Sequence, residues 1–243
     1  MNNIKNKEYL KQFFVGLLEG DGSIQVNNWR SKSLQFRLII KLKNLPSNYN
    51  MLILIAKAVG GQVRYTNKEK FVIWVVNDRE EVSRIIKLFD KYPLLTARKI
   101  CQLRFLKKCL KSPNIDEYFA TRDEKYSDVD TIIYNKSFHK VLELEYFKIW
   151  LVGFIEAEGC FSIRKNNSHS FSISQKNEQY LIEAIKVQFN GTTKVRKIKG
   201  SVYLIEIYKI DTLLKIGKFM KDYPLIGEKR ESYLRFFEQD KFK

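Results

Sequence analysis

The sequence contains few cysteines and histidines and fewer acidic than basic residues, and these shortages exclude several classes of protein. The three cysteines among its 243 residues, Cys101, Cys109 and Cys160, are far apart and form no CxxC pair. The sequence therefore indicates neither a disulfide framework nor a zinc ribbon, and we expect buried, reduced thiols in an intracellular protein. No apolar run approaches the roughly 20 residues that cross a bilayer. The first residues show neither a secretory signal nor a transit peptide.

The charge that is present is strongly positive. Lys and Arg number 44 against 27 Asp and Glu, which gives a net charge of +17. The excess lies in residues 1–111 (22 basic, 8 acidic) and 140–243 (19 basic, 13 acidic), whereas residues 112–139 hold 3 basic and 6 acidic groups. A globular protein this basic binds a polyanion, either a nucleic acid or an anionic membrane surface. The chain lacks a Lys-flanked amphipathic helix, so a membrane surface is the weaker alternative.

The chain contains an internal repeat. An acid at the end of an apolar helix recurs at an offset of 137, as Asp21 and Glu158, and a Tyr-Pro-Leu segment recurs at an offset of 131, with Pro93 and Pro224. We therefore expect an N-terminal repeat over residues 1–111, a linker over 112–139 and a C-terminal repeat over 140–243. A short helix in the linker is compatible with its composition.

Hydrophobic periodicity predicts the same elements in each repeat. After its first helix, the N-terminal repeat is expected to contain strands at 23–26, 34–43, 62–66 and 71–76, and helices at 49–59, at about 80–91 and from there to about 110. The C-terminal repeat is expected to contain strands at 160–165, 170–176, 194–199 and 202–209, and helices at 178–189 and 211–221.

Small residues mark one face of the first helix in each repeat. Gly16 and Gly20 lie four residues apart, as do Gly153 and Ala157. Residues with this spacing share a helix face, and small side chains there permit a close helix–helix approach. We expect the two helices to pack on each other where the two halves of the chain join.

Each of these helices ends in an acid, Asp21 or Glu158, followed by a glycine, Gly22 or Gly159, that suits the left-handed turn at a helix end. Two carboxylates brought together at negative helix ends repel each other. A divalent cation such as Mg²⁺ relieves this repulsion, since it prefers a few carboxylate oxygens with water and phosphate oxygens. Either acid alone would be more typical of a solvated helix end, but the recurrence of the acid at matching positions predicts a metal site at the junction.

The same residues carry a family resemblance. The segments FVGLLEGDG (14–22) and LVGFIEAEG (151–159) resemble two copies of the LAGLIDADG motif, and over roughly 8–110 and 143–240 the chain resembles the single-chain, two-repeat LAGLIDADG homing endonucleases. The resemblance implies an α+β fold of two pseudo-symmetric αββαββα repeats, each with a four-stranded antiparallel sheet that forms half of a DNA-binding saddle. It also implies a site-specific endonuclease that makes a metal-dependent double-strand break in a long, non-palindromic DNA target.

The resemblance assigns the metal site residue by residue. The eighth motif position is the metal-binding and catalytic acid, here Asp21 and Glu158, and the preceding residues, Gly20 and Ala157, would offer backbone carbonyls. The cation would be Mg²⁺, or Mn²⁺ or Ca²⁺ at the same acids. The sixth-position acids, of which Glu19 is the first, point to another side of the helix, and we expect a structural role for them.

Further catalytic residues follow from the resemblance. The family places a basic residue after a Pro-Leu segment, which corresponds to Arg98 and Lys229, where positive charge would stabilise the scissile phosphates. It also places a polar residue at the end of the second strand, which Gln175 matches in the second repeat. The equivalent residue of the first repeat is Leu42, so we expect the two halves of the active site to differ.

Alternation along the predicted strands leaves one polar, basic face per repeat, which suits the major groove of duplex DNA. The expected DNA-binding residues are Gln25, Asn27, Gln35, Arg37, Lys41, Lys43, Gln62 and Arg64 in the first repeat, and Ser162, Arg164, Ser172, Ser174, Lys176, Lys194 and Arg196 in the second. The first strand of each repeat is expected to direct Ile24, Val26, Phe161 and Ile163 inward.

Two alternatives share this fold: an intron maturase that binds RNA, and a DNA-binding protein without catalysis. The presence of both motif acids disfavours the second. His139 in the linker and His169 in a predicted turn occupy no repeated position, which disfavours a histidine-based nuclease. The resemblance implies a monomer. Together with the Lys-, Asn- and Ile-rich composition, which is typical of an AT-rich genome, it also favours an organelle, the mitochondrion before the chloroplast.

Overall fold

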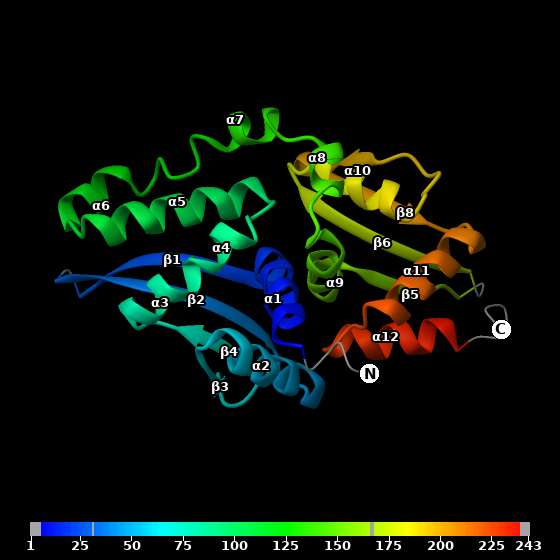
Figure 1. Ribbon diagram of the computed structural model, residues 1–243, viewed down its shortest axis with the longest axis horizontal. Helices are drawn as coiled ribbons and strands as arrows, with labels where there is room; N and C mark the ends of the chain where they lie inside the picture. Colours follow the sequence, from blue (N-terminus) through cyan, green and yellow to red (C-terminus); the bar gives the residue numbers. More distant parts are fainter. Residues whose placement is uncertain (1–5, 31, 166–167, 239–243) are drawn as a thin grey trace. The chain divides into compact units, whose positions relative to one another are not determined.

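The computed structural model describes residues 6–30, 32–165 and 168–238, which form two compact units. One unit combines the chain up to Gly20 with the chain from Lys136 onward, and the other runs from Asp21 to Asn135. The chain passes twice through the order αββαββα, each time around a four-stranded antiparallel sheet (Figure 1). The predicted α+β fold of two similar repeats is confirmed. The division at 112–139 stays a prediction.

The unit from Asp21 to Asn135 has the strand order β1-β2-β4-β3. Its strands are β1 (Gly22–Trp29), β2 (Ser33–Lys43), β3 (Gln62–Thr66) and β4 (Phe71–Val76). Its main helices are α2 (Pro46–Val59), α3 (Arg79–Ile86), α4 (Leu88–Lys91) and α5 (Ala97–Lys111).

Local chemistry sets the ends of these elements. Pro46 occupies the first turn of α2, where its missing N–H costs nothing, and Gly60 ends that helix at a φ of 101° that favours glycine. Asp78 caps α3 by accepting a hydrogen bond from the backbone N–H of Glu81 at 2.8 Å. Helix α2 therefore ends directly before β3, and α3 begins shortly after β4.

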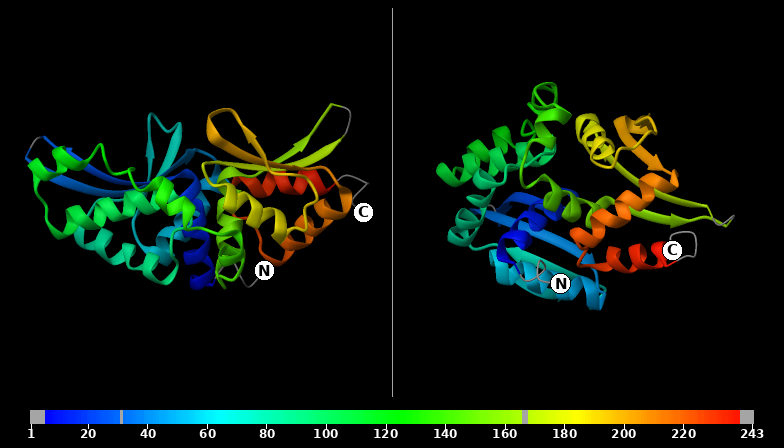
Figure 2. Two further views of the ribbon diagram at one scale, coloured as in Figure 1. Left: turned by 90° about the horizontal axis from the view of Figure 1, so that it is seen from above. Right: turned by 45° about the vertical axis from the view of Figure 1, so that its right-hand side comes forward.

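The other unit has the strand order β5-β6-β8-β7. Its strands are β5 (Cys160–Ile163), β6 (His169–Lys176), β7 (Arg196–Ile198) and β8 (Val202–Ile207). Its helices are α1 (Lys7–Asp21), α8 (Phe138–Leu142), α9 (Phe147–Glu158), α10 (Gln179–Gln188), α11 (Ile210–Asp222) and α12 (Glu228–Phe237). The last residue of α1, Asp21, is assigned to the other unit. In each unit the helices gather on one face of the sheet and leave the other face bare (Figure 2).

Several sequence expectations for the second repeat are wrong in detail. The strand expected at 194–199 is confined to Arg196–Ile198, because Gly200 and Ser201 adopt positive φ and form a tight turn before β8. The strand expected to reach residue 165 ends at Ile163, whose side chain is 43% exposed instead of inward. His169 begins β6 and is buried, so it does not lie in a turn.

The glycines after the motif acids do not adopt left-handed turns. Gly159 has φ −70° and ψ 147°, and Gly22 is the first residue of β1 with no positive φ. Glycine is needed at position 159 because a Cβ there would lie 2.7 Å from the carbonyl oxygen and the Cγ2 of Ile155. The chain thus turns directly from α9 into β5.

The acidic linker is mostly helical. Besides α8, it contains α6 (Ile115–Thr121) and α7 (Val129–Tyr134). Tyr118 of α6 donates a hydrogen bond to the carbonyl oxygen of Val26 in β1 at 3.3 Å, and Ile132 of α7 packs with Ala97 and Cys101 of α5. Helices α6 and α7 therefore complete the core of the unit that begins at Asp21.

Candidate active site and nucleic-acid interface

Helices α1 and α9 are in backbone contact at their motif glycines. A Cβ at Gly16 would overlap the carbonyl oxygen of Trp150 and lie 2.8 Å from the backbone nitrogen of Phe154. A Cβ at Gly153 would overlap the carbonyl oxygen of Phe13. Only glycine permits this approach at both positions, so the predicted small-residue packing of the two helices is confirmed.

The contact continues to the C-terminal ends of the two helices. A Cβ at Gly20 would overlap the Cβ of Ala157 and lie 3.2 Å from the Cγ of Glu158. The side-chain amide of Gln175 donates a long hydrogen bond, 3.5 Å, to Oε1 of Glu158. The structure thus brings Gly20, Ala157, Glu158 and Gln175 together in one unit. Asp21, the residue covalently bonded to Gly20, is where the other unit begins.

The sixth-position acid of the second motif, Glu156, holds the start of α12. Glu156 is 6% exposed, and its carboxylate accepts hydrogen bonds from the backbone N–H groups of Ile226, Gly227 and Lys229 at 3.1, 3.0 and 2.8 Å. Burial raises the pKa of Glu156, while the three N–H donors and the charge of Lys229 oppose that rise. This acid therefore fixes the backbone of Lys229, a predicted catalytic residue, to helix α9.

The sixth-position acid of the first motif, Glu19, also has a structural contact. It is 2% exposed and accepts a hydrogen bond from the indole N–H of Trp150 at 2.8 Å. Burial and the negative charge of Glu19 together raise the pKa of Tyr146. The expected structural role of these acids is supported by both sets of contacts.

A buried lysine in the Asp21–Asn135 unit was missed by the sequence analysis. Lys99 is 8% exposed, and its ammonium group donates a hydrogen bond to the carbonyl oxygen of Gly22, the residue after Asp21. Its neighbour Arg98 is exposed and places its guanidinium 5.0 Å from the ring centroid of Tyr126. In a helix that begins Ala-Arg-Lys, the sequence alone does not distinguish the inward basic residue from the outward one.

The predicted DNA-binding residues of the first repeat share one face of their sheet. Cross-strand register pairs Gln25 with Arg37 and Asn27 with Gln35 between β1 and β2. On the opposite face of β2, Phe36, Leu38 and Ile40 are 0–4% exposed. The predicted alternation of this strand is therefore confirmed. The remaining predicted residues, Lys41, Lys43, Gln62 and Arg64, oppose residues of β4 on the same bare face.

The middle of that face is apolar, which the sequence analysis did not foresee. The facing residues of β4 are Phe71, Ile73 and Val75, of which Ile73 and Val75 are 5% and 4% exposed. The ammonium group of Lys41 lies 4.3 Å from the ring centroid of Phe71. Long polar side chains from the flanking strands thus cover an apolar strip and carry the positive charge above it.

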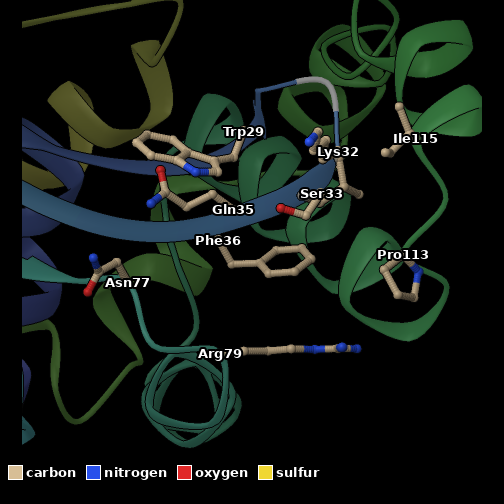
Figure 3. A pocket seen from close by; sticks show the side chains of 10 residues that line it. Trp29, Lys32, Ser33, Gln35, Phe36, Asn77, Arg79, Pro113 and Ile115 are labelled. Carbon is tan, nitrogen blue, oxygen red and sulfur yellow. The ribbon is translucent and has the colours of Figure 1, made fainter.

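The distal end of β1 and β2 adds an aromatic side chain to this face. Trp29 lies opposite Ser33, is 51% exposed, and has the guanidinium of Arg30 at 5.4 Å from its ring. It borders a cavity of about 410 Å³. The labelled side chains in Figure 3 show the other walls, which include Lys32, Gln35, Phe36, Asn77, Arg79, Pro113 and Ile115.

The second sheet has shorter strands than the first, and its bare face is rich in serine. Between β5 and β6, Ser162 pairs with Ser170 and Cys160 with Ser172. Between β6 and β8, Ser174 pairs with Leu204, and Leu204 also pairs with Arg196 of β7. Of the predicted DNA-binding residues here, Ser162, Ser172, Ser174, Lys176 and Arg196 lie in strands, and Arg164 follows β5 directly. Lys194 lies before β7 and outside the sheet, which corrects its expected place in a strand.

Two other residues differ from expectation. Cys160 is exposed, whereas Cys101 and Cys109 are buried as expected. Glu206 of β8 pairs with Ser172 and therefore lies on the bare face, where the sequence analysis placed no acid.

The donor set for a metal ion is small. Among the residues that the structure describes, no three His, Cys, Asp and Glu side chains converge. A cation bound by the motif acids would draw further ligands from backbone carbonyls, water or phosphate, and such an all-oxygen set suits Mg²⁺ or Ca²⁺. In the same residues, no helix is long and apolar enough to cross a membrane.

Comparisons with known proteins agree with this architecture. The chain shares 48% identity with a probable intron-encoded endonuclease of Debaryomyces hansenii, over 95% of this chain but only 38% of that protein. A probable intron-encoded endonuclease of Dictyostelium citrinum is also 48% identical, over 94% of each chain. A crystal structure of the LAGLIDADG homing endonuclease I-LtrWI bound to target DNA has the same fold, with a TM-score of 0.72, 22% identity, and coverage of 95% of this chain and 89% of that one.

The sequence profile described as LAGLIDADG endonuclease matches residues 14–109 and 151–239, which is most of the chain and includes both motif segments and both sheets. With its two glycine-packed helices and two matching sheets, the chain belongs to the LAGLIDADG endonuclease family.

Proposed function

We propose that the chain is a site-specific DNA endonuclease that makes a divalent-metal-dependent double-strand break in a long, non-palindromic target. The observation that carries the proposal is the contact of Gly20 with Ala157 and Glu158 at the ends of the two motif helices. It supports a site to which each motif contributes one acid, Asp21 from the first and Glu158 from the second.

In this proposal the carboxylates of Asp21 and Glu158 and the backbone carbonyls of Gly20 and Ala157 hold the cation. A bound Mg²⁺ would supply a nucleophilic water and neutralise charge on the phosphate. Gln175 orients Glu158 through its amide.

Basic residues complete the proposed site. Lys229, whose backbone is fixed by Glu156, and Arg98 place positive charge beside the scissile phosphates. The buried ammonium of Lys99 holds the backbone that follows Asp21. Gln175 has no polar counterpart in the first repeat, so the two strands of the target are cut by unequal groups.

The bare faces of the two sheets are the proposed DNA-binding surface. Each carries the polar and basic side chains on strands that fit a major groove, and the net charge of +17 favours a polyanion. Both repeats lie in one chain, which supports a monomer. The relatives are named as intron-encoded endonucleases, and a 27% identical protein of Saccharomyces cerevisiae is named as mitochondrial. These names support expression in a mitochondrion.

The test is cleavage of a randomised duplex pool with Mg²⁺ by the wild-type chain, followed by Asp21→Asn and Glu158→Gln on the selected target. We expect both variants to bind the duplex with near wild-type affinity and to lose double-strand cutting. Full cutting by either variant would contradict the assigned acids. A chain that binds and cuts no duplex would contradict the proposed function itself.

A further inference from the structure

The bare face of the second sheet holds one acid among its polar residues. Glu206 of β8 is the single acidic residue in the eight strands that the structure describes, and the corresponding position of the first sheet, 131 residues earlier, is Val75. On a surface that meets a polyanion, an isolated carboxylate repels the partner. Its presence there needs a physical reason.

The contacts of Glu206 supply that reason. Its Oε1 accepts a hydrogen bond from Arg164 at 2.8 Å, and its Oε2 accepts one from Arg196 at 3.1 Å. The same nitrogen of Arg164 donates to the hydroxyl oxygen of Tyr208 at 2.6 Å, and its guanidinium lies 5.1 Å from the ring centroid of Tyr208. We call these four residues the Glu206 cluster.

The strand order makes the Glu206 cluster a bridge across the sheet. In the order β5-β6-β8-β7, Arg164 follows β5 and Arg196 lies in β7, so the two arginines reach Glu206 from opposite sides. Arg164 must cross β6, where the facing residues Ser170 and Ser172 are small enough to leave room. Ser170 is only 1% exposed, as expected if a larger side chain lies over it.

The Glu206 cluster contributes little to stability. The side chains of Arg164 and Arg196 are 50% and 56% exposed, and ion pairs in that environment add little to folding stability because water and salt screen them. Glu206 is 18% exposed and the Tyr208 hydroxyl and both arginines lower its pKa, so it stays ionised and keeps both guanidiniums in place. What the arrangement provides is order in two long side chains before a partner arrives.

We propose that Glu206 is a specificity-determining positioning residue, which holds Arg164 and Arg196 so that their remaining N–H groups read guanine in the DNA major groove. The inference rests on the proposed function. A guanidinium matches the O6 and N7 acceptors of guanine as a two-pronged donor. Each arginine donates to Glu206 through one terminal nitrogen and has further N–H groups. Both oxygens of Glu206 are engaged, which disfavours a direct contact with the amino group of cytosine.

The test is a binding selection from a randomised duplex pool, with the base preference read at each position for the wild type, Glu206→Gln and Glu183→Gln. Glu183 is a matched control because it lies on α10, pairs with Lys186 at 3.2 Å and removes the same charge when substituted. We expect Glu206→Gln to weaken a guanine preference about tenfold in the half-site read by the second sheet. We expect unchanged preferences elsewhere and no change in Glu183→Gln.

Two further variants distinguish base recognition by the two arginines from base recognition by Glu206 itself. Arg164→Ala and Arg196→Ala should each weaken the preference at the position affected by Glu206→Gln or at the adjacent one. If both arginine variants keep that preference, Glu206 itself reads the base and the inference is wrong. An unchanged profile in Glu206→Gln, with melting temperature retained, would also overturn it. A wild-type chain that selects no sequence would overturn the proposed function together with this inference.

Discussion

The contact of α1 with α9 gives the sharpest quantitative prediction, because glycine is required there by geometry. Gly16→Ala places a methyl group on the carbonyl oxygen of Trp150, and Gly153→Ala places one on that of Phe13. A backbone oxygen cannot rotate away, so the cost should lie at the upper end of the usual 1–3 kcal/mol for an overpacked core. Alanine returns about 1 kcal/mol through its higher helix propensity.

The net expected loss is therefore about 2 kcal/mol for either substitution. In a chain of this size that corresponds to a fall in Tm of roughly 4–8 °C. The assay is urea or thermal unfolding followed by circular dichroism. Because both substitutions separate the same two helices, the double variant should lose less than the sum of the single losses.

The matched control is Gly191→Ala. A Cβ at Gly191 has its nearest neighbours at 3.3–3.4 Å, from Lys186 and Ile205, so this substitution should change the free energy of unfolding by less than about 0.5 kcal/mol. If Gly16→Ala and Gly153→Ala were as mild as the control, the two helices would not be in backbone contact. The assigned packing of the two motif helices would then be wrong.

Three further predictions follow from other contacts. Glu156→Ala leaves three backbone N–H groups without their acceptor and should lower the free energy of unfolding, measured with urea, by roughly 3 kcal/mol. A loss below about 0.5 kcal/mol would count against the contact. Lys99→Met removes the donor to the Gly22 carbonyl and should reduce the cleavage rate at least about tenfold, while duplex binding is kept. An unchanged cleavage rate would show that Lys99 does not support the site. The pKa of Glu206 is lowered in the folded state, so the stability it contributes is present above its unfolded pKa and is lost as pH falls through the folded value. The difference in melting temperature between wild type and Glu206→Gln should then shrink as the pH falls below the ordinary pKa of a glutamate, about 4.3, and a constant difference would contradict the ion pairs.

The repeat, the sheets and the helix contact could be predicted from the sequence because each depends on local pattern. The hairpin from β3 to β4 has the expected bounds, since two apolar runs flank a polar turn at Asn67, Lys68 and Glu69, which all adopt positive φ. The approach of α1 and α9 follows from glycine spacing alone. These features need no information about distant residues.

What the sequence did not reveal depends on distant contacts or on competition between neighbouring residues. The order of three short helices in the linker depends on burial of a few apolar residues such as Ile132, which composition does not show. Whether Arg98 or Lys99 points inward is decided by the position of Gly22, far away in sequence. Glu206 was missed because its partners come from β5 and β7, and only the strand order brings them together.

In the proposed site, Asp21 and Glu158 hold one or more divalent cations jointly. The most direct measurement replaces Mg²⁺ by Fe²⁺ in the complex with target DNA and maps the radical cuts that the ion makes in the nearby polypeptide by mass spectrometry. We expect cuts close to both residues 20–22 and residues 157–159, and we expect these cuts to disappear when excess Mg²⁺ is added. Cuts confined to one of these segments, or located elsewhere in the chain, would contradict it.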